Sequence, residues 1–249
     1  MLQRSRIKDI QRLSHKKFRD EAGEFVVEGP RMVAELLRER REGIRCIYAV
    51  SEWIETNREA LGGLPPERIC PVSQTELEAL STLESPNQVL AVVSKPAATG
   101  GHIPVNGFVL ALEDIRDPGN LGTIIRTADW FGVTDVVCSP STVDLYNPKV
   151  VQATMGSVFR VRVHEAGLVG WLGGLSDIAL LGATLDGRSI QGMGGLRRGV
   201  LVIGNEAHGL SEDVLGCCTE RVTIPRQGRA ESLNASVAAG ILLSHLTAV

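Results

Sequence analysis

Residues 108–132 read FVLALEDIRDPGNLGTIIRTADWFG, and this stretch decides the fold. A short apolar run leads into a polar turn and then into apolar residues at helical spacing, which predicts a strand joined to a helix. Later in the chain, DVVCSP, IALLGATLD and GVLVIGNE supply further short apolar runs, each separated from the next by helical stretches. This alternation is typical of a parallel sheet that is buried on both faces. We therefore predict an α/β fold for the C-terminal part of the chain.

Two domains are expected within the 249 residues. Residues 1–95 predict a small α/β domain, with strands near 24–28, 45–50 and 89–93 and a helix over 30–41. Residues 96–106 are rich in Pro, Gly and other small residues, so they are predicted to be a linker. The larger α/β domain then covers residues 107–249.

Composition excludes several classes of protein. The chain is 43% hydrophobic and has a net charge of −3, which argues against intrinsic disorder. It lacks an apolar run long enough to span a membrane, and its N-terminus is charged where a signal peptide turns apolar, so we expect a cytoplasmic protein. The five cysteines show no CxxC or His/Cys ligand spacing, which argues against a metal site. Cys217 and Cys218 are interpreted as small packed side chains at a helix end rather than as a redox pair.

The charge is distributed unevenly along the chain. Residues 1–19 carry seven basic side chains against one acidic one, a net charge of +6, so the other 230 residues carry about −9. A basic segment of this kind suits contact with RNA phosphates, and an ordinary solvated helix face explains it as well. The candidate RNA contacts are Arg4, Arg6, Arg12, Lys16 and Lys17.

Candidate ligand-binding residues follow three of the predicted elements, since open α/β sheets bind ligands beyond the carboxyl ends of their strands. The first stretch holds Asn120, expected to cap the helix, and Arg126 within the helix. In the second, GVLVIGNEAHGL at 199–210, Gly204 and Glu206 follow the apolar run. The third, IPRQGRAESLNAS at 224–236, offers two further capping residues, Ser232 and Asn234.

Several common sites are missing from the sequence. It contains no P-loop, no nucleophile elbow and no HExxH, and its glycine-rich stretch at 192–199 does not follow a strand as a dinucleotide site requires. Local chemistry thus predicts a ligand-binding α/β domain beside a domain compatible with RNA.

Together, the three stretches resemble the three motifs of the SpoU family of RNA ribose 2′-O-methyltransferases, in the SPOUT superfamily. The matching segments are 120–128, 203–210 and 224–236, in the family's order. GEFVVEGPRMVAELL at 23–37 and LESPNQVLAVV at 83–93 are similar to the substrate-binding domain of many members, which has a ribosomal-protein-like α/β fold. The resemblance therefore extends over nearly the whole chain.

The resemblance implies a parallel sheet with a deep trefoil knot, S-adenosylmethionine as cofactor, and a homodimer with its active site near the subunit interface. Its catalytic residues correspond to Asn120, Arg126, Glu206, Ser232 and Asn234. Its cofactor-binding residues correspond to Thr184, Gly204, Ile224 and Leu233, although Ile224 and Leu233 also suit a hydrophobic core. Gln152 departs from the family, because a basic residue is frequent at its position.

The implied reaction is methylation of a ribose 2′-hydroxyl in structured RNA, with 23S ribosomal RNA favoured. Transfer RNA as the substrate, and a non-catalytic RNA-binding protein with the same fold, are the alternatives. Arg126 is expected to orient the substrate and stabilise charge, since a guanidinium stays protonated at neutral pH. Substrate phosphate, solvent or an unusually perturbed Arg126 then removes the proton, and the sequence leaves these three options open.

Overall fold

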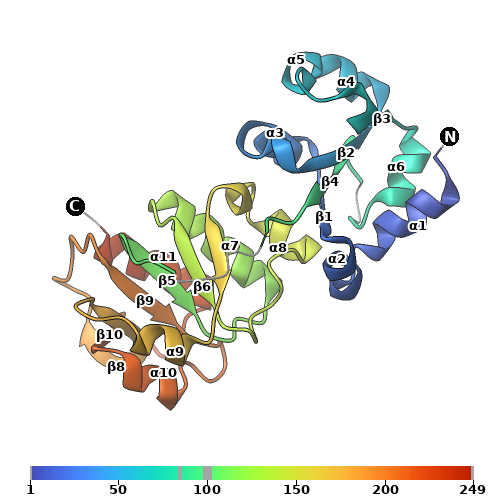
Figure 1. Cartoon of the computed structure of the whole chain (residues 1–249). Coiled ribbons are helices and arrows are strands. Elements are labelled where there is room, and N and C mark those ends of the chain that lie inside the picture. Colours follow the sequence, from blue (N-terminus) through green and yellow to red (C-terminus); the bar gives the residue numbers. More distant parts are fainter. Residues whose placement is uncertain (1, 84–85, 98–102, 248–249) are drawn as a thin grey trace. The chain divides into compact units, whose positions relative to one another are not determined.

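Two compact units make up the chain in the computed structural model, which describes residues 2–83, 86–97 and 103–247. The first unit is Met1–Ala98 with Tyr146–Phe159, and the second is Thr99–Leu145 with Arg160–Val249. Residues 98–102 of the predicted linker and residues 84–85 of the motif at 83–93 lie outside the described residues. Figure 1 labels most of the helices and strands of both units.

The first unit is a four-stranded sheet covered by helices, with strand order β1-β4-β2-β3. Strand β4 is antiparallel to β1 and β2, and β3 is parallel to β2. The strands are β1 (Glu24–Glu28), β2 (Ile44–Ala49), β3 (Ile69–Pro71) and β4 (Val89–Ser94). The helices are α1 (Arg4–Arg12), α2 (Lys16–Ala22), α3 (Pro30–Glu39), α4 (Ser51–Thr56), α5 (Arg58–Leu61), α6 (Gln74–Leu80) and α8 (Pro148–Ala153), with short 3-10 turns at Arg41–Gly43, Pro66–Arg68 and Ser157–Phe159.

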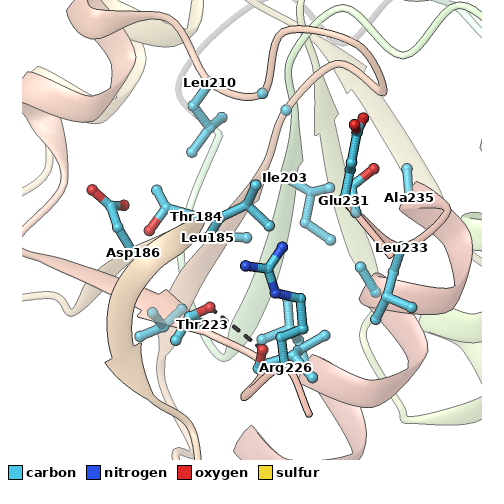
Figure 2. A pocket seen from close by; sticks show the side chains of 18 of the residues that line it. Thr184, Leu185, Asp186, Ile203, Leu210, Thr223, Arg226, Glu231, Leu233 and Ala235 are labelled. Atoms are coloured by element: carbon cyan, nitrogen blue, oxygen red, sulfur yellow. Dashed lines mark hydrogen bonds between the residues drawn. The ribbon is translucent and has the colours of Figure 1, made fainter. Parts of the chain in front are cut away.

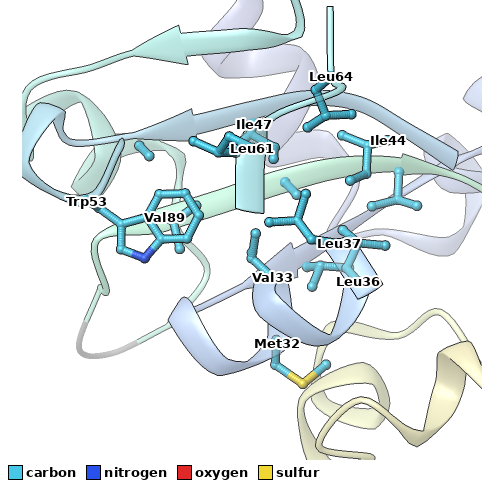
Figure 3. Packing of buried hydrophobic residues seen from close by; sticks show 14 of the residues in the cluster. Met32, Val33, Leu36, Leu37, Ile44, Ile47, Trp53, Leu61, Leu64 and Val89 are labelled. Atoms are coloured by element: carbon cyan, nitrogen blue, oxygen red, sulfur yellow. The ribbon is translucent and has the colours of Figure 1, made fainter. Parts of the chain in front are cut away.

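One hydrophobic core of this unit lies between the sheet and helix α3, and a second core joins the sheet to helices α1 and α6 through Ile10, Leu77 and Leu90. Val33 and Leu36 of α3 are buried in one hydrophobic cluster with Ile44 and Ile47 of β2, and Met32 joins this cluster from the side of α3 that faces away from the sheet (Figure 3). Burial of such side chains stabilises the fold by roughly 1.5–3 kcal/mol each.

Helix α8 packs into this same core, although its residues follow β6 in the chain. Val151 of α8 is buried in the cluster, and the Tyr146 ring lies 4.6 Å from the Phe25 ring of β1. A Cβ on Gly156, which has φ +99°, would come within 2.7 Å of the Glu35 side chain on α3. The sequence prediction placed residues 146–159 in the C-terminal domain, whereas their apolar side chains are buried in the N-terminal unit.

The second unit is a six-stranded sheet in which all neighbouring strands are parallel, in the order β10-β8-β9-β5-β6-β7. It confirms the predicted α/β class. The strands are β5 (Phe108–Leu112), β6 (Asp135–Cys138), β7 (Arg162–Glu165), β8 (Leu180–Ser189), β9 (Gly199–Ile203) and β10 (Glu220–Thr223). The helices are α7 (Pro118–Trp130), α9 (Leu168–Gly173), α10 (Glu212–Cys217) and α11 (Ala235–Leu246).

The central strands β5 and β9 are buried on both faces. Val109 and Val202 belong to the hydrophobic cluster shared with α9 and α10. Because side chains alternate along a strand, Leu110 and Leu201 point to the opposite face, where α7 and α11 pack on each other. Among the described residues, no helix is long and apolar enough to cross a bilayer.

Candidate active site

A hollow of about 770 Å³ lies beyond the carboxyl ends of strands β9 and β10, against the middle of β8. Its walls come from the middle of β8, from the loop after β9 and from the segment between β10 and α11 (Figure 2). All four residues that the sequence suggested for cofactor binding line it: Thr184, Gly204, Ile224 and Leu233. Parallel sheets usually bind ligands at this edge, so the hollow is the candidate site.

Thr184 and Gly204 indicate what the hollow can hold. The Thr184 hydroxyl is buried and has no hydrogen-bond partner among the described residues. A buried hydroxyl without a partner costs roughly 1–3 kcal/mol, so a ligand with a polar group would relieve that cost. A Cβ on Gly204 would lie 2.2 Å from the carbonyl carbon of Gly209, which shows that the loop after β9 folds back tightly over this position. The hollow therefore combines a polar contact with closely approaching backbone.

Three side chains from the three motif segments form a hydrogen-bonded chain. The Asn120 amide on α7 donates to the Glu206 carboxylate at 2.8 Å, and the Asn234 amide donates to the Asn120 oxygen at 2.8 Å. Asn234 also caps α11, since its oxygen accepts from the backbone N–H groups of Ser236 and Val237. The first contact joins residues that are 86 positions apart in the sequence, and the second joins residues that are 114 positions apart. Glu206 lines the hollow, so this chain lies at its rim.

The predicted capping role of Asn120 is wrong. Helix α7 begins two residues earlier, at Pro118, and Asp117 is its N-cap, with a carboxylate oxygen 2.8 Å from the Asn120 backbone nitrogen. Proline favours the first helical turn because its missing N–H is not needed there, which moves the cap to the preceding residue. The Asn120 side chain is thus free of the helix end and available for Glu206 and Asn234.

Ser232 and Arg126 stand apart from this chain. Ser232 is exposed and lines the hollow, while Asn234 alone caps α11. Arg126 is exposed on α7 and is not among the residues that line the hollow. Its guanidinium has no hydrogen bond or ion pair with any described residue. It lies six residues beyond Asn120, an axial rise of about 9 Å, and is available to a substrate or a second subunit.

A second group of polar side chains holds the loop after β9 in place. The Asn205 amide donates to the backbone oxygen of Asp114 at 2.9 Å and to its carboxylate at 3.1 Å, and the Asn205 oxygen accepts from the Ala207 N–H at 2.8 Å. The hydrogen bond from Arg116 lowers the pKa of the Asp114 carboxyl, so this anchor stays ionised. Glu113 accepts from both the N–H and the hydroxyl of Ser211 at the far end of the loop.

Sequence reasoning missed several residues that line the hollow, among them Asp186 on β8 and Arg226 in the third segment. The available signal for Asp186 was its spacing of two residues from Thr184 along β8. The signal for Arg226 was its position within the motif segment 224–236. Cys217 and Cys218 are half-buried free thiols at the end of α10. Burial raises the pKa of Cys218 to about 11, which makes its thiol unreactive and agrees with the packing interpretation.

The candidate RNA contacts lie on α1 and α2. Arg4, Arg12, Lys16 and Lys17 are exposed, as a phosphate-binding role requires. Arg6 is half-buried, and its Nε donates to the Tyr48 hydroxyl at 2.7 Å, so it fastens α1 to strand β2.

Comparison with known proteins identifies the family. Residues 107–244 match the SpoU rRNA Methylase family, and the chain is 31% identical over 244 residues to 23S rRNA (guanosine(2553)-2′-O)-methyltransferase RlmP of Bacillus subtilis (strain 168), covering 97% of this chain and 95% of that protein. The chain belongs to the SpoU rRNA methylase family. Residues 4–91 of this SpoU family member also match the MRM3-like substrate binding domain.

Two further similarities extend over nearly the whole SpoU chain. It is 33% identical over 247 residues to 23S rRNA (uridine(2479)-2′-O)-methyltransferase of Streptomyces viridochromogenes, covering 93% of this chain and 85% of that protein. The crystal structure of the SpoU methyltransferase AviRb from Streptomyces viridochromogenes in complex with AdoMet matches with a TM-score of 0.84 and 29% identity, covering 98% of this chain and 97% of that one.

Proposed function

We propose that this protein transfers a methyl group from S-adenosylmethionine to a ribose 2′-hydroxyl of ribosomal RNA. The observation that carries the proposal is the convergence of the three motif segments, which meet as Asn120, Glu206 and Asn234 at the rim of the hollow. Family membership and the names of the two 23S rRNA methyltransferases support the choice of reaction and of ribosomal RNA over transfer RNA. A deep trefoil knot is expected from membership of the family.

The hollow fits S-adenosylmethionine by its chemistry. Thr184 offers an unpartnered buried hydroxyl, Gly204 keeps the backbone close, and Ile224 and Leu233 supply apolar surface. When bound, the cofactor would supply an electrophilic methyl group for transfer to the ribose oxygen, and its sulfur would leave as a neutral thioether that keeps the electron pair of the broken carbon–sulfur bond. The protein's own residues then have to align the ribose and compensate the change in charge.

In the proposal, five side chains perform this alignment: Arg126, Asn120, Glu206, Ser232 and Asn234. Arg126 binds the ribose hydroxyl or the adjacent phosphate and stabilises the developing charge, because its guanidinium is cationic and exposed. Asn120, fixed from both sides by Glu206 and Asn234, keeps the start of α7 in register with the loop after β9. The ribose proton leaves to substrate phosphate, to solvent or to a perturbed Arg126.

The protein acts as a homodimer in this proposal, with each active site near the subunit interface. Trp130, at the end of α7, is 84% exposed, and Val237 on α11 is 49% exposed. These two helices pack on each other and leave large apolar side chains on their outer surface. Such side chains are enriched in interfaces, so a second copy is a suitable partner for this surface. Its proximity would also give Arg126 a binding partner.

Residues 1–95 are the RNA-binding domain in this scheme, residues 96–106 the linker and residues 107–249 the catalytic domain, apart from the segment 146–159 that packs in the N-terminal unit. Arg4, Arg12, Lys16 and Lys17 contact RNA phosphates, and Arg6 positions α1. A cytoplasmic location accords with a ribosomal RNA substrate. The alternative of a binding protein without activity is disfavoured by the retention of all five candidate catalytic residues in one chain.

The Arg126→Ala variant tests the catalytic assignment. It should lose methyl transfer to 23S rRNA while it binds S-adenosylmethionine with unchanged affinity in calorimetry, because Arg126 does not line the hollow. Lys149→Ala, which removes an exposed cation outside the three motifs, is the matched control and should keep its activity. Full methyl transfer by Arg126→Ala would contradict the assignment. Absence of cofactor binding by the wild-type protein would contradict the proposed function itself.

A further inference from the structure

A second, smaller hollow lies on the N-terminal unit, where the end of α1 meets α2. It has a volume of about 300 Å³, and its lining consists of Lys8, Gln11, Arg12, His15 and Phe18. Lys8, Gln11 and Arg12 lie three and four positions apart on one face of α1, and His15 follows the turn after α1 as the N-cap of α2, with an extended backbone. Phe18 comes from α2 and forms the apolar side of the hollow.

Flat side chains meet in this hollow. The Arg12 guanidinium carbon lies 5.4 Å from the centroid of the Phe18 ring, and the His15 ring meets Phe18 edge to face, with centroids 6.3 Å apart. Aromatic rings and guanidinium planes are the surfaces on which proteins stack unpaired RNA bases. The Gln11 amide donates to the Ala79 backbone oxygen of α6 at 2.7 Å, so this helical face is anchored to the rest of the unit.

The charge of the hollow is positive. Lys8 and Arg12 are cationic and exposed, and none of the five lining residues is acidic. The nearest carboxylate described for Arg12 is Asp9 at 3.9 Å, and more than half of each side chain is exposed, so this ion pair is weak. The exposed Lys16 and Lys17 add positive charge at the start of α2, where Lys17 lies 3.9 Å from Glu21 of the same helix. Single-stranded nucleic acid suits this combination, because its phosphates pair with cations and its bases stack on flat side chains.

We propose that this hollow binds one unpaired nucleotide of the RNA substrate. The base stacks on the group formed by Arg12, His15 and Phe18, and the phosphate pairs with Lys8. The inference rests on the proposed function, which identifies the substrate as RNA. It adds that the part of the RNA bound in this hollow is single-stranded. An acidic peptide would satisfy the cations but would leave the stacking surface unused, and a continuous duplex would expose no base.

The test measures binding of two fluorescein-labelled probes to the full-length protein by anisotropy over a range of KCl concentrations. One probe is a 12-nucleotide oligo(A), and the other is a 12-base-pair RNA duplex. Phe18→Leu should weaken oligo(A) binding about fivefold or more through lost stacking, with the salt dependence and the duplex affinity unchanged. Lys8→Gln should lower the salt slope for oligo(A) by about 0.7, as expected for one lost phosphate contact on a single strand.

Phe18→Tyr is the matched control, because it keeps the ring and should bind oligo(A) as the wild type does. Unchanged thermal melting of Phe18→Leu would show that the variant folds. Wild-type affinity of Phe18→Leu for oligo(A), or an equal loss on the duplex, would overturn the inference. Displacement of oligo(A) by a 12-residue oligo(Glu) at equal concentration would also overturn it.

Methyl transfer to 23S rRNA is measured in parallel, so the two failures are distinguishable. If the wild-type protein transfers no methyl group while Phe18→Leu still loses oligo(A) binding, the proposed function is refuted and the hollow is supported. If the wild-type protein methylates and Phe18→Leu binds both probes normally, only the hollow is refuted.

Discussion

Replacement of Gly204 by alanine should damage the cofactor site more than any other single-methyl change in the loop after β9. The added Cβ would lie 2.2 Å from the carbonyl carbon of Gly209 and 2.4 Å from the Leu210 nitrogen, whereas real Cβ atoms essentially never approach closer than 3.0 Å. Backbone atoms therefore have to move by about 0.8 Å, since 3.0 minus 2.2 is 0.8. Overpacking of this kind costs typically 1–3 kcal/mol, and a misplacement near 1 Å can reduce catalysis about 100-fold.

Calorimetry with S-adenosylmethionine and single-turnover methyl transfer measure this effect. We expect Gly204→Ala to lose about 10-fold or more in cofactor affinity, the equivalent of roughly 1.4 kcal/mol, while the protein remains folded. Gly216→Ala is the matched control, because a Cβ there meets nothing within 4 Å and Gly216 lies inside α10. Wild-type cofactor affinity and activity in Gly204→Ala would refute the reasoning that this loop closes over the cofactor.

Three further perturbations test other parts of the structure. Asn120→Ala should lower methyl transfer about 10- to 100-fold with little change in cofactor affinity, because Glu206 and Asn234 lose their shared partner; unchanged turnover would contradict this role. Trp130→Ser should shift the protein from dimer to monomer in sedimentation velocity, and a dimer as stable as the wild type would place the interface elsewhere. Although burial opposes ionisation of Asp135, hydrogen bonds from Arg162 and His164 lower its pKa from 3.8 to about 2. This carboxylate therefore stabilises the fold above about pH 4 and loses its contribution as the pH falls toward 2, so Asp135→Asn should lower the unfolding free energy in urea at pH 7 and match the wild type near pH 2. An equal difference at both pH values would contradict the ion-pair explanation.

The sequence predicted the parallel sheet because its strands are short apolar runs separated by helical stretches. This pattern can be read from the sequence without knowledge of tertiary contacts. Strands β5 and β9 illustrate the point, since every residue from Val109 to Leu112 and from Gly199 to Ile203 is buried. Helix α8 shows the limit of such reasoning. Its apolar residues indicated burial but not the core in which they are buried, which depends on contacts with β1 and α3 far away in the sequence.

The candidate site could be predicted in part for the same reason. Capping chemistry is local, so the sequence predicted Asn234 correctly as a cap. It was wrong for Asn120, because Pro118 starts helix α7 and makes Asp117 the cap. The hydrogen bonds between Asn120, Glu206 and Asn234 join three distant segments, and only the motif resemblance brought these residues together beforehand. Arg6 was grouped with the RNA contacts by its charge, and its bond to Tyr48 depends on the packing of α1 against β2.

The most direct test of the central claim is to incubate the purified protein with S-adenosylmethionine and 23S rRNA from a strain that lacks it, and then to map 2′-O-methylated nucleotides. The account predicts a new ribose methyl group at a defined nucleotide, present with the wild-type protein and missing with Arg126→Ala. A methyl group on a base, on transfer RNA alone or on no RNA at all would contradict it.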